Sequence, residues 1–254
     1  MLFYLKTVLV IPYLILAFLA GLLTSLVRPF HPNNVWLFCQ YLYPVLPVLG
    51  VRFEIEGLQK LQDNAPAIII SNHQNNLDIF PCARSMLKRT VSLGKASIKF
   101  IPIFGQFYWL SGNILIKREN RRKAMRSMRQ VQETIVNKKT SVWILPEGTR
   151  SRGRGLLPFK KGAFVTAIHA QVPIVPICYN SYHNTLDLNK WDAGMIKGRV
   201  LDPISTVGLS ASDAAELAQR CHALMLNCIE QLDKEVAAAN LNRKEARRQR
   251  QSLA

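Results

Sequence analysis

The sequence predicts an α/β domain with a mixed, largely parallel sheet flanked by helices, and an N-terminal membrane-inserted helical segment in front of it. Short β-branched runs alternate with stretches of helical periodicity, which is the pattern of an α/β fold. The amino-terminal region is apolar and almost free of charge. The 254 residues are 49% hydrophobic and only 19% charged, so the chain can bury a large core and is too apolar to be disordered.

An uncharged run from Thr7 to Val27 predicts a membrane helix. Its 21 residues would span roughly 31 Å as a helix, which is about the thickness of a bilayer core. A secretory signal would have a shorter apolar core of about 7–15 residues and a cleavage motif. The core helix of a soluble protein is seldom apolar over such a length. Pro12 lies near the start of the run, so the first turns can kink or lie in the membrane interface.

A second apolar stretch, residues 35–51, is interrupted by Pro44 and Pro47. It makes a poor spanning helix, and we expect it to dip into the membrane or lie on its surface. Residues 1–51 are therefore predicted to form a membrane anchor. If the first run spans the bilayer, the amino terminus lies outside the cell, whereas a hairpin of the two runs would keep it inside.

Residues 52–240 carry the pattern of the α/β domain. Strands are predicted at four apolar runs, which are residues 67–71, 114–116, 141–145 and 173–179. A further apolar run ends just before Lys95. Between them, residues spaced by four, three and four predict one apolar helix face: Ala124, Met128, Val131 and Ile135. Continuous apolar strands separated by helices are typical of a parallel sheet that is covered on both faces.

Residues 210–236 predict a carboxy-terminal helix that packs on this domain. Its apolar face is expected to contain these residues: Leu217, Cys221, Leu224, Cys228 and Leu232. Residues 241–254 form a basic tail. Such charge runs are most often solvated, although this one could also contact an anionic membrane surface.

The net charge of +17 and the pI near 10.0 imply an anionic partner, which could be nucleic acid, a phospholipid surface or a phosphorylated substrate. The five cysteines are odd in number and have no metal-ligand spacing. We therefore expect reduced, partly buried thiols in a cytoplasmic compartment, and no metal site.

The stretch "SNHQNNLD", residues 71–78, follows a buried-looking strand directly. In a continuous helix His73 and Asp78 would lie about 140° apart around the axis and could not touch. If the strand ends at Ser71 and a helix starts near Asn75 or Asn76, Asp78 can reach back to the imidazole. A carboxylate on one ring nitrogen leaves the other free to act as a general base. The competing interpretation is a turn histidine beside an ordinary acid of the first helical turn.

The stretch "LPEGTRSRGRG", residues 145–155, also leaves a strand and carries three arginines with no acid after Glu147. Gly148 lets the backbone approach a ligand closely, and the Arg150 guanidinium can bind phosphate through two parallel hydrogen bonds. Gly112 and Arg118 lie at the ends of another short strand. A single basic residue is usually a solvated charge, but several at strand ends indicate a ligand site, because α/β folds bind ligands there.

At these positions the sequence resembles the bacterial 1-acyl-sn-glycerol-3-phosphate acyltransferases, within the wider glycerophospholipid acyltransferase family, over essentially the whole chain. Four ordered blocks carry the resemblance: N-H-x-x-x-x-D at Asn72, His73 and Asp78, a glycine-to-arginine block from Gly112 to Arg118, E-G-T-R from Glu147 to Arg150, and V-P-I-x-P from Val172 to Pro176. One departure is Asn75-Asn76, where many relatives have Ser-Trp.

The resemblance implies a glycerolphosphate acyltransferase-like fold and transfer of an acyl group from acyl-CoA or acyl carrier protein to the 2-hydroxyl of lysophosphatidic acid, which gives phosphatidic acid. His73 would be the base and Asp78 would orient it. The positions implied to bind substrate are Lys95, Gly112, Arg118, Glu147, Gly148, Thr149 and Arg150. Of these, Arg150, Arg118 and Lys95 would hold the phosphate, and Glu147 would order the loop and its arginines. Transfer would be direct, without an acyl-enzyme, a metal or any other cofactor.

The implied partners are a phospholipid bilayer, lysophosphatidic acid, and acyl-CoA or the acidic acyl carrier protein. We expect a location at the cytoplasmic membrane with the domain facing the cytoplasm, consistent with the excess of lysine and arginine after Val27. A related acyltransferase that acts on glycerol-3-phosphate or another lysophospholipid would carry much the same blocks. A membrane-tethered nucleic-acid-binding protein is disfavoured, because the sequence has no recognition-helix, RRM or zinc signature and no basic–aromatic interleaving.

Overall fold

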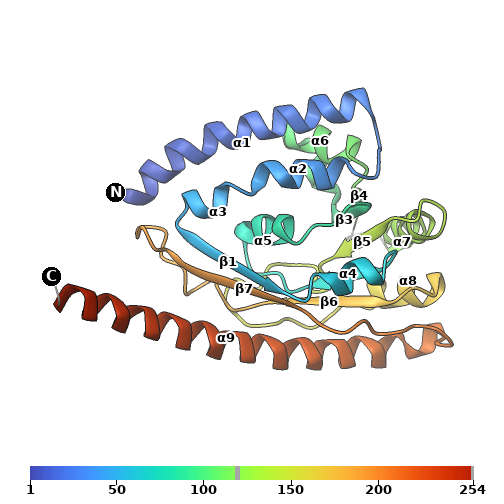
Figure 1. The fold of residues 1–254 in the computed structure, drawn as a ribbon. Coiled ribbons are helices and arrows are strands. Elements are labelled where there is room, and N and C mark those ends of the chain that lie inside the picture. The colour runs from blue at the N-terminus through green and yellow to red at the C-terminus, as the bar shows by residue number, and fades with distance from the viewer. Residues whose placement is uncertain (118–120, 253–254) are drawn as a thin grey trace.

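A mixed sheet runs through the middle of the protein (Figure 1), in a computed structural model that describes residues 1–117 and 121–252. Within these residues the sheet has seven strands in the order β1-β7-β6-β2-β5-β3-β4. The strands are β1 (Val51–Glu56), β2 (Ile68–Ser71), β3 (Thr90–Lys95), β4 (Ile114–Ile116), β5 (Ser141–Ile144), β6 (Ile174–Tyr179) and β7 (Gly194–Val200). All neighbours are parallel except β6 and β7, which confirms the predicted mixed, largely parallel sheet.

The four strands predicted from apolar runs are β2, β4, β5 and β6, and the run before Lys95 is β3. The sequence pattern did not reveal β1 and β7. Both carry charged, solvent-accessible side chains, because Glu54 and Glu56 of β1 are exposed and β7 carries Lys197 and Arg199. These two cations form salt bridges with Glu56 on β1 and Glu235 on the last helix. A strand that is half covered and charged does not produce a continuous apolar run.

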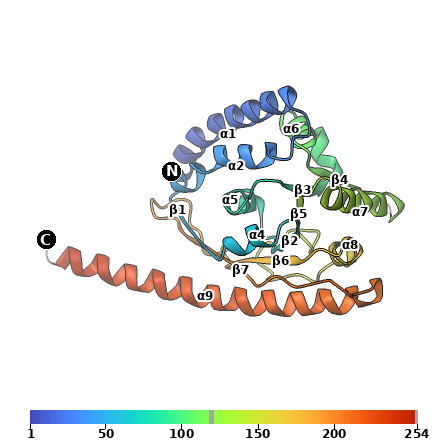
Figure 2. The ribbon, with the colours of Figure 1, turned by 45° about the vertical axis from the view of Figure 1, so that its right-hand side comes forward.

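Helices cover both faces of the sheet (Figure 2). The α-helices are α1 (Leu2–Val27), α2 (Asn34–Leu42), α3 (Val45–Val48), α4 (Gln59–Asp63), α5 (Ile79–Arg84), α6 (Phe104–Leu110), α7 (Arg121–Val136), α8 (Gly162–Ala170) and α9 (Ala214–Ser252). Short 3₁₀ segments are η1 (Asn76–Asp78), η2 (Ala96–Phe100) and η3 (Ala211–Asp213). Helices α2, α3 and α5 lie on one face with α1 outside them, and α8 and α9 lie on the other.

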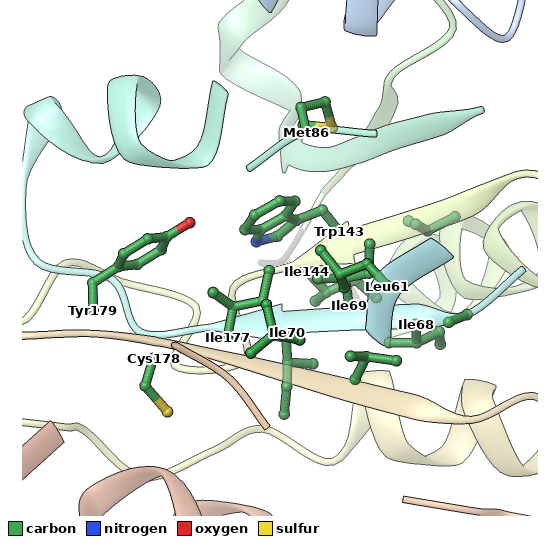
Figure 3. Packing of buried hydrophobic residues seen from close by; sticks show 14 of the residues in the cluster. Leu61, Ile68, Ile69, Ile70, Met86, Trp143, Ile144, Ile177, Cys178 and Tyr179 are labelled. Atoms are coloured by element: carbon green, nitrogen blue, oxygen red, sulfur yellow. The ribbon is translucent and has the colours of Figure 1, made fainter. Parts of the chain in front are cut away.

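The core is centred on β2, whose residues Ile68, Ile69 and Ile70 are at most 2% exposed. Each fully buried isoleucine contributes about 1.5–3 kcal/mol relative to an exposed one. On the neighbouring strand β6, Tyr179 points toward α5 and Cys178 points toward α9, as Figure 3 shows. Both helical layers therefore pack directly on the central strands.

The predicted apolar faces of two helices are largely confirmed. In α7, Val131 and Ile135 are buried and Met128 packs on the core, whereas the Ala124 side chain lies outside what the structure describes. In α9, one predicted position is wrong: Leu224 is exposed and its neighbour Met225 is buried instead. The five cysteines are free thiols, of which four are buried and Cys82 is partly buried, as expected.

Helix α9 continues well beyond residue 236, to Ser252, so the predicted basic tail forms the end of the same helix over its described residues 241–252. Arg243 makes a salt bridge with Asp192, and the Asn240 side chain accepts a hydrogen bond from Arg52. Beyond these contacts the basic end of α9 projects from the domain (Figure 1).

Most apolar residues between positions 35 and 51 pack against protein, so the predicted dipping or surface-lying segment is also part of the folded domain, and its contact with a membrane stays a prediction. Val35, Phe38, Leu42, Val45 and Leu46 are all at most 5% exposed and belong to the same core as the sheet. Composition alone cannot distinguish an apolar face that is covered by protein from one that is covered by lipid. A boundary at residue 51 therefore does not separate two hydrophobic cores.

Helix α1 is long and apolar enough to cross a membrane by length and composition, with a mean hydropathy of 2.3 and 11% of the span buried. It nevertheless packs along α2 and α6. Near its start, the buried Lys6 Nζ donates to the Leu49 and Lys190 carbonyls at 2.7 and 2.6 Å. Toward its end, a side chain at Gly21 would approach a Phe38 ring carbon to 2.8 Å, so only glycine allows α1 and α2 to lie this close.

Candidate active site

The chain turns sharply after β2, and hydrogen bonds to β6 hold this turn. The Asn72 side chain donates to the Tyr179 carbonyl and accepts from the Tyr179 amide, both at 2.9 Å. The next side chain but one, Gln74, donates to the Asn180 carbonyl at 2.8 Å. His73 lies between these two clamps and is 17% exposed. The turn therefore presents one imidazole from a backbone that is fixed on both sides.

Asp78 reaches back to His73, as the sequence predicts. Asn75 is the N-cap of η1, with its side chain accepting from the Leu77 amide at 2.7 Å. This cap starts the helical turn at Asn76 and brings the buried Asp78 carboxylate under the preceding loop. Asp78 Oδ2 forms a short hydrogen bond with His73 Nδ1 and accepts from the Gln74 amide at 2.7 Å. With Asp78 ionised, Nδ1 carries the proton and Nε2 has a free lone pair.

The loop after β5 lies against His73 and forms the second half of the site. Glu147 Oε1 accepts from the His73 amide at 2.5 Å, and Oε2 accepts from the Leu157 amide at 3.0 Å. The Ser151 amide donates to the His73 carbonyl at 2.8 Å. Glu147 thus orders loop backbone, as expected, and it holds the backbone of His73 as well.

Burial raises the pKa of the Glu147 carboxyl to about 7, and the nearby negative charge of Asp78 acts in the same direction. The two backbone hydrogen bonds lower this pKa but do not offset burial. Because the folded protein holds the proton more tightly than the unfolded chain, this group stabilises the fold at low pH. That contribution is fully present below the unfolded value of about 4.5 and is lost as the pH rises through about 7.

We therefore expect Glu147→Gln to flatten the pH dependence of stability. The wild-type protein in detergent should lose melting temperature between pH 5 and pH 8 relative to the variant, because the amide does not titrate. Melting curves of both proteins across this range give the difference directly. If the difference in melting temperature between wild type and variant is the same at every pH from 5 to 8, Glu147 is ionised throughout this range.

Cationic side chains lie along the same edge of the sheet. Strands β2, β5, β3 and β4 are adjacent and parallel, so their carboxyl ends lie side by side. Arg150 is exposed and precedes Ser151, whose amide binds His73. Lys95 is the last residue of β3, which is two strands away from β2. At a spacing of about 4.8 Å per strand, the end of β3 lies roughly 10 Å from the end of β2. Since β5 and β3 follow β2 in the strand order, both cations lie on the same side of the imidazole, at a scale that suits a small phosphorylated molecule.

Two other residues of the β5 loop, Gly148 and Thr149, lie at this edge. Gly148 has φ +69, a left-handed conformation that favours glycine, and a side chain there would meet Lys160 Cε at 2.8 Å. Thr149 is exposed beside Arg150. Arg118 lies outside the described residues, and the residue before it, Lys117, follows the carboxyl end of β4.

Gly112 does not lie with the other predicted site residues. It precedes β4 and so lies at the amino end of the strands, whereas His73 and Glu147 follow carboxyl ends. There it lines a cavity of about 470 Å³ together with Arg89 and Trp109, and no residue of the His73 site lines that cavity. Its φ of +95 identifies a turn residue. A direct contact of Gly112 with substrate therefore stays a prediction.

Sequence reasoning missed the contribution of the segment that follows β6. The Tyr182 hydroxyl donates to Asp78 Oδ1, and the His183 amide donates to Gln74 Oε1 at 3.1 Å. The available signal was position, because "NSYHN" at residues 180–184 follows the carboxyl end of an apolar strand just as the other site loops do. The site is therefore built by three loops, after β2, β5 and β6.

This arrangement can remove a proton from a hydroxyl group of an anionic substrate. In such a step His73 Nε2 would be the base, Asp78 would balance the charge of the imidazolium, and Arg150 and Lys95 would supply positive charge nearby. No hydroxyl or thiol is hydrogen-bonded to the His73 ring among the described residues. Among those residues, no group of three or more histidine, cysteine, aspartate or glutamate side chains is placed to hold a metal ion.

Comparison with known proteins gives one consistent family. The family model described as Acyltransferase matches residues 52–180. The 1-acyl-sn-glycerol-3-phosphate acyltransferase of Haemophilus influenzae is 42% identical over 240 residues, which are 94% of this chain and 100% of that protein. The protein of the same name from Escherichia coli K12 is 39% identical over 237 residues, 93% of this chain and 97% of that protein.

A solved structure has the same fold. The crystal structure of the 1-acyl-sn-glycerophosphate (LPA) acyltransferase PlsC from Thermotoga maritima superposes with a TM-score of 0.63, covers 79% of each chain and is 20% identical. The fold class expected from the sequence is therefore found in a protein of related name.

Proposed function

We propose that this chain, which belongs to the acyltransferase family and within it to the 1-acyl-sn-glycerol-3-phosphate acyltransferases, transfers a fatty acyl group from a thioester to the 2-hydroxyl of 1-acyl-sn-glycerol-3-phosphate. The product is phosphatidic acid. The observation that carries this proposal is the His73–Asp78 pair, held between the β5 and β6 loops with Arg150 beside it.

The reaction needs only one proton to be moved. His73 Nε2 takes the proton of the 2-hydroxyl as its oxygen attacks the thioester carbonyl. The tetrahedral intermediate then collapses, the carbon–sulfur bond breaks, and the imidazolium returns the proton to the departing thiolate. Asp78 holds the imidazole and stabilises its charged form throughout. The thioester is already activated, so no acyl-enzyme forms and no cofactor takes part.

The acceptor phosphate is the group that the cations of this edge would bind. Arg150 and Lys95 supply the charge, and Arg118, carried over from the sequence motif, would add a third. The donor would be acyl-CoA or acyl carrier protein, which both present phosphate or acidic groups to a chain with a net charge of +17.

The acceptor carries an acyl chain, and the surface of α1 suggests how it reaches the site. One face of α1 exposes a row of large apolar side chains that includes Leu5, Val8, Leu9, Leu16 and Leu23. Phe100 and Ile101, exposed just after Lys95, continue the apolar surface through α6, which packs on α1. We place this surface in the lipid of the cytoplasmic membrane, with the site's edge next to it and the domain in the cytoplasm.

The contacts of α1 favour the hairpin-like topology over a full span. Lys6 near its start and Gly21 near its end both lie against the folded domain, and the Phe30 amide donates to the Leu110 carbonyl at 2.7 Å. A helix whose two ends are fixed to one domain keeps both ends on the same side of the bilayer. These contacts support our proposal that the amino terminus lies on the cytoplasmic side.

We expect that, in a protein tagged at both ends, the amino-terminal and carboxy-terminal tags are accessible to added protease from the same side of the membrane. In sealed inside-out vesicles both tags should be accessible, and in right-side-out vesicles both should be protected. Washing with high salt or carbonate should leave the protein in the membrane, because apolar burial rather than charge holds it. Opposite accessibility of the two tags would establish a spanning α1.

The proposed reaction is tested with the purified full-length protein in detergent. We expect label from a radiolabelled acyl thioester to appear in phosphatidic acid when 1-acyl-sn-glycerol-3-phosphate is added. Without this acceptor the thioester should be hydrolysed only slowly. Rapid acceptor-independent hydrolysis, or no consumption of either acyl-CoA or acyl carrier protein thioesters, would contradict the proposal.

A further inference from the structure

Tyr182 makes a buried contact with the acid of the His73–Asp78 pair. Its side chain is 1% exposed, and its hydroxyl donates to Asp78 Oδ1. The other carboxylate oxygen, Oδ2, binds His73 Nδ1 and the Gln74 amide. Each oxygen of Asp78 thus faces a different partner, with the phenol on one side and the imidazole on the other.

The position of Tyr182 is fixed by contacts with both the catalytic turn and α9. Its own amide donates to the Asn180 carbonyl at 2.8 Å, and that carbonyl also accepts from Gln74 Nε2. The Ser181 amide donates to Asp233 Oδ1 on α9 at 2.6 Å. The phenol is therefore placed against Asp78 by its own loop and does not depend on the histidine for its orientation.

Tyr182 remains a hydrogen-bond donor at every pH at which the protein would work. Burial raises the pKa of its phenol well above the usual value, and the negative charge of Asp78 raises it further. A neutral phenol beside a buried carboxylate has one low-energy arrangement, in which it donates. Since charge-assisted hydrogen bonds are the stronger kind, this bond both fixes the carboxylate rotamer and withdraws negative charge from it.

We propose that Tyr182 is a positioning residue of the acyl-transfer reaction, which orients Asp78 toward His73 and limits how strongly Asp78 favours the protonated imidazole. The inference rests on the proposed function, because it assigns Tyr182 a role in the same base. Tyr182 acts through Asp78, and nothing in the proposal requires it to touch the acceptor.

The test is Tyr182→Phe, which removes one hydroxyl and keeps the ring. Loss of a charge-assisted hydrogen bond should lower kcat about 10-fold or more, with little change in KM for the acceptor. With one donor fewer, Asp78 holds the imidazolium more strongly. The acid limb of the kcat/KM profile, where the base becomes protonated, should therefore move to higher pH.

The chain offers a matched control in Tyr179. This residue is also 1% exposed. Its hydroxyl donates to the Pro81 carbonyl on α5 at 3.2 Å and to Ser85 Oγ, just after α5, at 2.9 Å, and not to Asp78. Tyr179→Phe should therefore leave the acid limb where it is in the wild type. Any loss of activity that comes only from a disturbed core should appear in both variants.

Other titratable groups face this pair, and the control accounts for them. Glu147 accepts from the His73 amide, Cys82 on α5 lies near Asp78, and Tyr179 on β6 lies near Asp78 and Tyr182. All of them except the mutated tyrosine are unchanged in each variant. A shift of the acid limb that appears only in Tyr182→Phe is thus due to the phenol on Asp78.

A second variant keeps the test decisive if Tyr182→Phe does not fold. Site-specific 3-fluorotyrosine at position 182 keeps the hydroxyl and makes it a stronger donor, so the acid limb should move to lower pH. Equal shifts in the Tyr179 and Tyr182 variants, or no shift with either replacement at position 182, would overturn the inference. All pH profiles are measured with whichever acceptor the wild type acylates. If that acceptor is not lysophosphatidic acid, the proposed substrate is wrong, but the role of Tyr182 is still tested.

Discussion

Replacing His73 by alanine is expected to lower kcat for acyl transfer by at least about 100-fold, which is the lower range for loss of a general base. The side chain is 17% exposed. The hydrogen bond to Glu147 that holds this turn is made by the His73 backbone amide, so it does not depend on the imidazole. The variant should therefore fold normally. Transfer of labelled acyl groups to lysophosphatidic acid, measured with melting curves of the same preparations, separates the two effects.

His169→Ala is the matched control for this experiment. His169 is an exposed residue on α8, on the other helical layer, and its side chain takes no part in the site. Its replacement should leave kcat unchanged. Asp78→Asn should also be severely impaired, because an amide can favour the wrong imidazole tautomer. Near-wild-type turnover by His73→Ala would remove the histidine from the mechanism.

Replacing Arg150 by alanine is expected to cut kcat/KM for lysophosphatidic acid by about 10- to 150-fold, which corresponds to the loss of a charge-assisted contact of roughly 1.5–3 kcal/mol. Arg150→Lys should not restore activity, because a lysine cannot make two parallel hydrogen bonds to a phosphate. The effect should be specific to the phosphate. A monoacylglycerol acceptor, which lacks that group, should be a poor substrate of the wild type and should lose much less.

Arg220→Ala provides the control for charge alone. Arg220 is exposed on α9, so its loss lowers the net charge by the same amount without touching the site. This variant should behave as the wild type with both acceptors. If Arg150→Ala affects both acceptors equally, Arg150 serves the loop or the thioester donor, and the phosphate site must be sought at Lys95 and Arg118.

The sequence predicted the parts of this protein that have strong local signals. Strands β2 and β5 are buried throughout and, apart from one serine each, apolar, because both their faces are covered; such runs are recognisable without a structure. The contact of Asp78 with His73 was also predictable, because it spans five residues and follows from an N-cap at Asn75. Local spacing is enough to place two groups that lie within one turn of chain.

The parts that the sequence did not reveal depend on contacts between distant residues. Tyr182 meets Asp78 across 104 positions, and no periodicity connects the two. Gly112 has the residue type of a ligand-binding loop, but the direction of β4 places it at the opposite edge from His73. Leu224 and Met225 are neighbours of similar hydrophobicity, so a small difference in helix rotation decides which of them is buried.

The central claim is that this site transfers an acyl group to an acceptor that carries both a phosphate and an acyl chain. The most direct test is to compare kcat/KM of the purified protein for 1-acyl-sn-glycerol-3-phosphate, glycerol-3-phosphate and a lysophospholipid with a larger head group, using one labelled acyl thioester. We predict that 1-acyl-sn-glycerol-3-phosphate is preferred and that phosphatidic acid is the labelled product. A higher kcat/KM for glycerol-3-phosphate or for the lysophospholipid with the larger head group would contradict the claim.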